Sequence, residues 1–100
     1  MDILSEGPTL VLSGHFHGRS TSEVRSALRM RLDAPEHEIV VDLTGVESVD
    51  VPALRVLAFA SHEALRTGHH VTLRGAGPAV RRMLHLTRLM RFVELEQDAA

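Results

Sequence analysis

Apolar and polar positions follow two different periods along the chain, and together they predict an α/β domain. Short runs of Val, Leu and Ile favour strands, whereas longer segments with apolar residues three and four positions apart favour helices. The predicted strands are residues 3–4, 9–13, 38–43, 70–74 and a short one within 89–95; the predicted helices are 21–32, 50–67 and one beginning at Pro78. The order is therefore β-β-α-β-α-β-α-β, followed by a tail at 96–100 that we expect to fray.

This order predicts the topology of the sheet. Strands that alternate with helices imply right-handed crossovers and a largely parallel sheet. The first two strands form a hairpin around Gly7 and Pro8, which adds an antiparallel pair. We therefore expect one domain over residues 1–100, with a mixed, mostly parallel sheet of four to five strands and helices packed on it. Residues 38–43 show little polar alternation, so we expect this central strand to be covered on both faces or nearly so.

Local signals predict where the helices and turns begin. Ser20 and Glu23 fit a capping box at the start of the first helix. Thr44 and Gly45 predict a turn after the central strand, and residues 14–19 predict a loop after the second strand.

Asp50 and Gly68 mark the ends of the second helix. Asp50 is a good N-cap, Pro52 falls in the first turn, where a missing N–H costs little, and Gly68 is the stop. Its predicted core stripe is Leu54, Leu57, Ala58, Ser61, Ala64 and Leu65. Phe59 lies on the opposite, polar face, so it is either buried under a neighbouring loop or exposed as a contact residue at a protein interface.

Composition narrows the class of protein. The chain has no cysteine, which excludes disulfides and thiolate chemistry, and its net charge of −2 gives no general attraction to nucleic acid. No apolar run approaches the ~20 residues of a membrane span. The N-terminus lacks the basic and long apolar regions of a signal peptide. We expect a cytoplasmic protein with no membrane span and no nucleic-acid partner.

Candidate chemistry is sparse. His15 and His17 would point the same way in an extended segment, but the spacing brings no third ligand to them, and a zinc site needs three or four. Ser48 lies near Asp50 without a nucleophile elbow or a recognisable oxyanion site. The nucleotide-binding and metalloprotease motifs GxGxxG, P-loop and HExxH are absent. We therefore predict no enzyme activity, no catalytic residue, no metal and no cofactor.

Two segments in the middle of the chain resemble a known family. Val41–Val46 reads VDLTGV, and Val49–Leu57 reads VDVPALRVL. With the element order, they resemble the STAS domain, the family of bacterial anti-sigma factor antagonists. Leu12–Phe16 is similar to the family's first loop and Gly77–Leu84 to its C-terminal third, so the resemblance covers nearly the whole chain.

The resemblance implies a non-enzymatic regulator of transcription. Such proteins bind an anti-sigma factor of the serine-kinase type by protein–protein contact and thereby free a sigma factor. The family's usual switch is phosphorylation of a serine in an Asp-Ser-Ser-Gly-Leu motif at the start of the second helix. A phosphate there disrupts docking by repulsion and desolvation.

This chain departs from the family at the switch. Its motif reads Asp50-Val51-Pro52-Ala53-Leu54, so both serines are absent and Pro52 occupies the usual phospho-acceptor position. His17 stands where the family's first loop often has an aspartate. We therefore predict no phosphorylation at the usual position. The partner-binding residues that the resemblance implies are Asp50, Val51, Pro52, Ala53, Leu54, Val56, Phe59, His17 and Ser20.

Three interpretations of the missing switch follow. In the first, the chain is an antagonist that binds its anti-sigma factor constitutively. We favour this interpretation because free-standing small STAS chains are most often of this type. In the second, it is a STAS scaffold subunit of a signalling complex or an accessory subunit of a membrane transporter. In the third, its partner contact differs and is regulated elsewhere, for instance at Ser20, Thr21, Ser22 or Ser48. An unpaired edge strand would also allow a homodimer.

Overall fold

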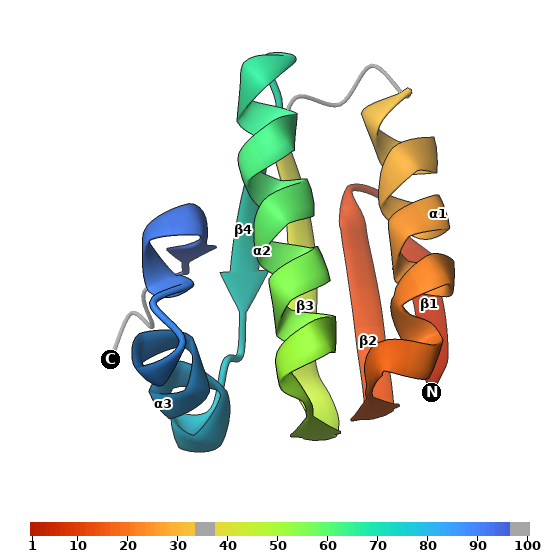
Figure 1. The fold of residues 1–100 in the computed structure, drawn as a ribbon. Coiled ribbons are helices and arrows are strands. Elements are labelled where there is room, and N and C mark those ends of the chain that lie inside the picture. Colours follow the sequence, from red (N-terminus) through yellow and green to blue (C-terminus); the bar gives the residue numbers. More distant parts are fainter. Residues whose placement is uncertain (34–37, 97–100) are drawn as a thin grey trace.

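The computed structural model describes residues 1–33 and 38–96. Two helices lie side by side across one face of a five-stranded sheet, and a third lies beside the second (Figure 1). The strands are β1 (Asp2–Glu6), β2 (Thr9–Phe16), β3 (Glu38–Val49), β4 (His70–Arg74) and β5 (Glu94–Leu95). The helices are α1 (Thr21–Leu32), α2 (Val51–Arg66) and α3 (Pro78–Leu86), with short 3₁₀ turns η1 (Gly18–Ser20) and η2 (Met90–Phe92).

The sheet confirms the predicted α/β class and topology. Its strand order is β1-β2-β3-β4-β5. β1 pairs antiparallel with β2, and every other pair is parallel. Because the carboxyl ends of parallel strands meet at one edge, the segments that follow β2 and β3 lie together there. That edge carries most of the residues predicted to bind a partner.

β2 and β3 are longer than the sequence predicts. The expected turn at Thr44 and Gly45 is wrong, because both residues remain in β3. The expected loop over residues 14–19 is wrong for residues 14–16, which belong to β2, whereas residues 17–19 do lie outside the strand. Ser13 pairs with Gly45 and Gly14 with Val46, and the register shifts on either side of these pairs. Pairing between the strands satisfies the backbone groups and holds the segments extended despite their local turn signals.

The hydrophobic core lies on one face of the sheet. The side chains facing the helices are buried: Leu10, Leu12, Phe16, Ile39, Val41, Leu43, Val71 and Leu73. On the other face, Val11, Val40 and Thr72 are partly exposed. The prediction that the central strand is covered on both faces is therefore wrong. Ile39 and Val41 point under the helices, while Val40 between them lies on the open face, as strand alternation requires.

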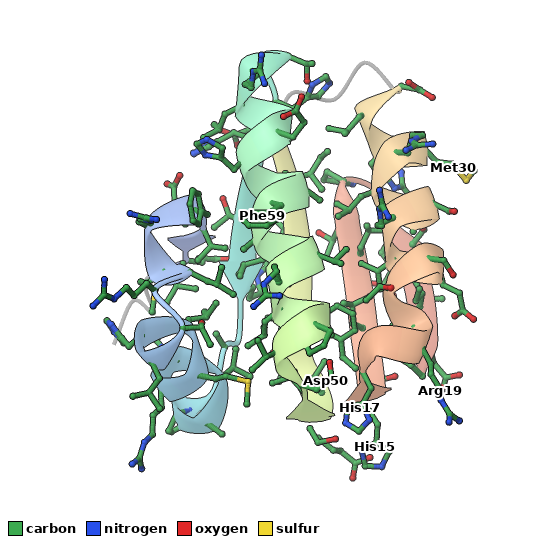
Figure 2. All side chains as sticks on the ribbon, in the orientation of Figure 1. His15, His17, Arg19, Met30, Asp50 and Phe59 are labelled. Atoms are coloured by element: carbon green, nitrogen blue, oxygen red, sulfur yellow. The ribbon has the colours of Figure 1, made fainter. Side chains whose placement is uncertain are left out.

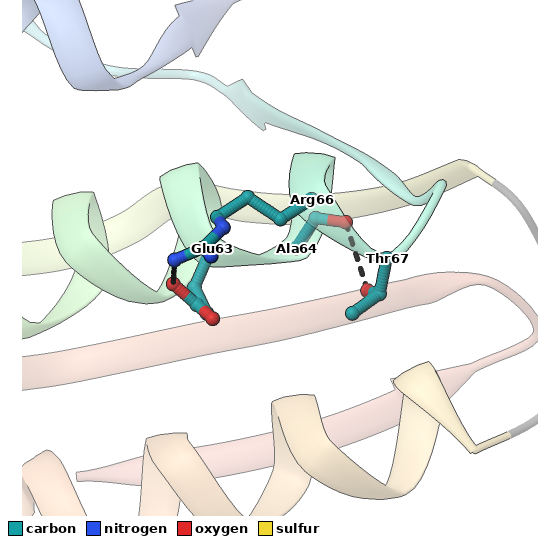
Figure 3. Close-up of polar contacts among 4 residues, drawn as sticks. All are labelled: Glu63, Ala64, Arg66 and Thr67. Carbon is teal, nitrogen blue, oxygen red and sulfur yellow. Dashed lines mark hydrogen bonds and ion pairs between the residues drawn. The ribbon is translucent and has the colours of Figure 1, made fainter.

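α2 begins and ends as predicted, at the Asp50 cap and just before Gly68, whose φ is +82°. Figure 3 shows the closing contacts: the Thr67 hydroxyl donates to the Ala64 carbonyl at 3.0 Å. The predicted core stripe is buried except for Leu65, which is 53% exposed. Leu65 lies in the last turn of α2, which projects beyond the ends of the strands (Figure 1).

α1 has the predicted bounds but not the predicted cap. The Ser20 side chain makes no cap hydrogen bond, so the expected capping box is wrong. Ser20 closes η1 with helical backbone angles (φ −95°, ψ −3°), whereas a capping residue is extended. Thr21 instead links the start of α1 to η1, since its hydroxyl donates to the Gly18 carbonyl at 2.9 Å.

The C-terminal segment is held to β4. Glu96, predicted as the first residue of a frayed tail, donates its N–H to the Leu73 carbonyl at 2.8 Å. Its carboxylate accepts from Arg74 Nε, also at 2.8 Å. Residues 97–100 of the predicted tail lie outside the described residues. Across the described ranges, no helix has the length and apolar character needed to cross a bilayer.

Candidate functional site

The predicted partner-binding residues lie mainly where β2 and β3 end and α2 begins. Figure 2 shows His15, His17 and Asp50 together at this end of the molecule, with Phe59 farther along α2. We call the surface formed by His17, Ser20, Asp50, Val51 and Pro52 the α2 tip. It comes from two connections that are distant in sequence and adjacent in the sheet, as β2 and β3 are paired neighbours.

Asp50 holds the two halves of the α2 tip together. Its Oδ2 accepts the Gly18 N–H at 3.0 Å, and its Oδ1 accepts the Ala53 N–H at 2.9 Å. The first bond reaches across to the segment after β2; the second caps α2. Gly18 lies so close that an added Cβ would be 3.6 Å from Pro52 Cβ. One carboxylate therefore fixes the position of η1 relative to the start of α2.

These contacts shift the acidity of the carboxyl group. The Gly18 N–H, above all, holds the pKa of Asp50 below its ordinary value of 3.8. Desolvation opposes this shift, while the Ala53 N–H and the nearby His17 favour it. Both hydrogen bonds stabilise the charged form of the carboxylate, which is the form that caps a helix and favours the positive end of its dipole.

Replacing Asp50 with alanine should lower the free energy of unfolding by about 1 kcal/mol at neutral pH, the usual cost of losing an N-cap. The loss should be pH-dependent. Folding lowers the pKa of this carboxyl group, so the group stabilises the fold fully at pH values above its unfolded pKa of 3.8. This stabilisation is lost as the pH falls through the lower pKa of the folded state. The difference between wild type and variant should therefore shrink below about pH 4.

Urea unfolding followed by circular dichroism tests this expectation, because the chain has no Trp or Tyr for fluorescence. Ser20→Ala is the matched control, since Ser20 occupies the cap position of α1 without a side-chain cap bond. It should cost at most a few tenths of a kcal/mol. An Asp50→Ala penalty that stays constant from pH 6 to pH 3 would contradict the assigned role of the carboxylate.

His15 and His17 converge on Ser48. The Ser48 Oγ lies 2.7 Å from His15 Nδ1 and 2.8 Å from His17 Nε2, and the two ring centroids are 5.8 Å apart. A hydroxyl can donate to one imidazole and accept from the other, so the cluster joins the end of β2 to β3. The expected common direction of the two histidines is confirmed. Among residues 1–33 and 38–96, no group of three or more His, Cys, Asp or Glu is placed to hold a metal ion.

The predicted partner-binding residues differ in exposure. Ala53 and Leu54 are fully buried, so their side chains belong to the core beneath the α2 tip. His17 and Pro52 are exposed, whereas Ser20, Asp50, Val51 and Val56 are half-buried. These exposed and half-buried residues are the ones that can contact a partner without unfolding.

Phe59 is partly covered by a neighbouring segment, and its role as a contact residue stays a prediction. Its ring packs edge-to-face on Phe92 of η2, with centroids 5.5 Å apart, yet the residue remains 50% exposed. It is therefore anchored against a neighbouring segment and still presents apolar surface to solvent. A rigid aromatic of this kind is well suited to a protein interface.

A groove between α1 and α2 was missed by the sequence reasoning. It has a volume of about 530 Å³. Its apolar lining is Leu28, Leu32, Val56, Phe59 and Ala60, and its charged lining is Arg25, Arg29 and Glu63. The available signal was the spacing of Arg25 and Arg29, which places both on one outward stripe of α1. The groove itself depends on how α1 and α2 lie on the sheet, which their separate patterns do not specify.

A family model described as "Mlab, STAS domain" matches residues 1–95. The chain belongs to the STAS domain family. A search of curated proteins found no match for this STAS domain. Solved structures similar to it include protein TM1081 from Thermotoga maritima, at 20% identity over 98% of this chain and 86% of that one, with a TM-score of 0.76.

Two further structures show the range of proteins that share this fold. An anti-sigma factor antagonist from Mycobacterium paratuberculosis is 24% identical over 97% of this chain and 84% of that one, with a TM-score of 0.74. A sulfate transporter family protein from Wolinella succinogenes is 11% identical over 88% of this chain and 73% of that one, with a TM-score of 0.71. At these identities the likeness establishes the fold of the STAS domain alone. It gives no support to a homodimer.

Proposed function

We propose that this STAS domain is a non-enzymatic regulator of transcription, an anti-sigma factor antagonist that acts in the cytoplasm. It binds an anti-sigma factor of the serine-kinase type by protein–protein contact. The observation that carries the proposal is the α2 tip. Two exposed residues, His17 and Pro52, stand beside the half-buried Val51, and Asp50 holds this surface in one arrangement through hydrogen bonds to Gly18 and Ala53.

The physical properties of the tip support docking. A surface already fixed by hydrogen bonds loses little conformational entropy on binding. Val51 and Pro52 offer apolar area for the centre of an interface, where charged residues are depleted. Val56 and Phe59 extend this apolar area along α2.

The start of α2 has no hydroxyl at the position of the family's usual switch. Pro52 lies in the first turn of α2, where its missing N–H costs little, and residues 50–54 contain no Ser, Thr or Tyr. The nearest hydroxyl before this segment, that of Ser48, is hydrogen-bonded to two histidines. We therefore expect constitutive binding that phosphorylation of the helix start does not control.

One alternative has an observation in its favour. This STAS domain could serve as an accessory subunit of a membrane transporter, because a sulfate transporter family protein has the same fold. A scaffold role in a larger signalling complex would use the α2 tip in the same way. The identity of the captured partner distinguishes these functions.

Affinity capture from the native host, followed by incubation with ATP and intact-mass measurement, tests the proposal. We expect the chain to recover an anti-sigma factor of the serine-kinase type and to keep its unmodified mass. Recovery of transporter subunits instead would favour the alternative. A stoichiometric phosphate on the chain, mapped to Ser48 or to the hydroxyls at 20–22, would show that regulation has moved to another residue.

A further inference from the structure

The groove between α1 and α2 carries a second, more specific recognition feature. Leu28, Val56 and Ala60 contribute apolar lining to it, with the exposed ring of Phe59. Its lining residues all come from α1 and α2, so it presents side chains and no free strand edge. These two helices are neighbours on the sheet (Figure 1). A bound extended segment would leave its backbone N–H groups unpaired on this apolar surface, whereas a helix satisfies them internally.

The charges beside the groove favour an acidic occupant. Arg25 and Arg29 are exposed, and neither makes an ion pair or side-chain hydrogen bond within residues 1–33 and 38–96. Glu63, on the α2 side, is already paired with Arg66 at 3.4 Å (Figure 3). The uncompensated charge beside the apolar lining is therefore positive.

We propose that this groove binds an amphipathic helix of the partner protein, with an apolar stripe against α1 and α2 and acidic side chains facing Arg25 and Arg29. This inference rests on the proposed function and adds the chemistry of the partner segment. The lining on α1 runs from Arg25 to Leu32. At 1.5 Å per residue that is about 10 Å, so the groove would engage about two turns of the partner helix.

The test uses two synthetic peptides instead of the unidentified partner. Each is a stapled helix of about 14 residues, long enough to span the groove, with leucines on one stripe. One peptide carries glutamates along the edge that would face α1; the other carries lysines at the same positions. Fluorescence anisotropy of a label on the peptide gives the dissociation constants.

We expect the acidic peptide to bind at least about tenfold more tightly than the basic one. Its glutamates would attract the two exposed arginines, whereas the lysines of the basic peptide would repel them. The double variant Arg25→Glu/Arg29→Glu should reverse this preference. Arg82→Glu/Arg88→Glu, which makes the same charge change on the α3 side of the molecule, should preserve it. Peptide-induced NMR shifts should concentrate on the methyl groups of Val56 and Ala60, which line the groove and are partly exposed.

Several results would overturn the inference. These are equal binding of the two peptides, no measurable binding of either, or equal sensitivity to both double variants. Binding of phosphatidylglycerol vesicles through Arg25 and Arg29, without binding of the acidic peptide, would assign the groove to a membrane surface instead. The peptide assay needs no anti-sigma factor, so its failure is separate from a failure to capture the proposed partner.

Discussion

Replacing Gly75 with alanine is expected to lower the free energy of unfolding by about 3 kcal/mol, through a steric clash combined with backbone strain. Gly75 has a φ of +71°, a conformation that residues with a Cβ rarely adopt. An added Cβ would also lie 2.0 Å from Thr44 Oγ1 and 3.0 Å from both Thr44 Cβ and its backbone nitrogen. The hydroxyl could rotate away, but the backbone nitrogen belongs to β3 and cannot.

Gly68 provides the matched control for this substitution. Its φ is +82°, yet an added Cβ would meet nothing within 4 Å. Gly68→Ala should therefore cost only the backbone strain, about 1 kcal/mol. In the Gly75→Ala background, Thr44→Ala should recover part of the loss by removing the clashing hydroxyl. If chemical unfolding shows that Gly68→Ala and Gly75→Ala lower the free energy of unfolding equally, the predicted contact with Thr44 is refuted.

Replacing Pro52 with glutamate is expected to weaken binding of the partner about 100-fold, or about 2.7 kcal/mol. The substitution places a negative charge on the exposed α2 tip, where docking would strip it of water without an established counter-charge. The effect is analogous to that of a phosphate at this position, but it needs no kinase.

The same substitution should leave the fold intact. Pro52 is exposed and lies in the first turn of α2, where glutamate interacts favourably with the helix dipole. We therefore expect its free energy of unfolding to stay within about 0.5 kcal/mol of wild type, as for most surface substitutions. Loss of binding could then be attributed to the surface and not to unfolding.

The ends of α2 were predictable because they depend on local chemistry. Asp50 caps the helix through its own side chain, and Gly68 terminates it with a positive φ. The family resemblance likewise directed attention to the edge where Asp50 and His17 lie. The cap and the stop follow from the properties of individual residues and their near neighbours in sequence.

Other features depend on contacts that the sequence does not specify locally. Thr44 and Gly45 stay extended because β3 pairs with β2. Ser20 fails to cap because η1 sets its backbone angles before α1 begins. The bonds from His15 and His17 to Ser48 span more than 30 positions. The α1–α2 groove likewise requires two separate helices to be placed side by side on the sheet.

Calorimetric titration of the captured anti-sigma factor with wild type, Pro52→Glu and Pro78→Glu tests the docking surface most directly. Pro78 is the matched control, because it is an exposed proline in the first turn of α3, as Pro52 is in the first turn of α2. We expect Pro52→Glu to raise the dissociation constant about 100-fold and Pro78→Glu to leave it within about twofold. Equal dissociation constants for wild type and a folded Pro52→Glu variant would contradict the assignment of the α2 tip as the partner-binding surface.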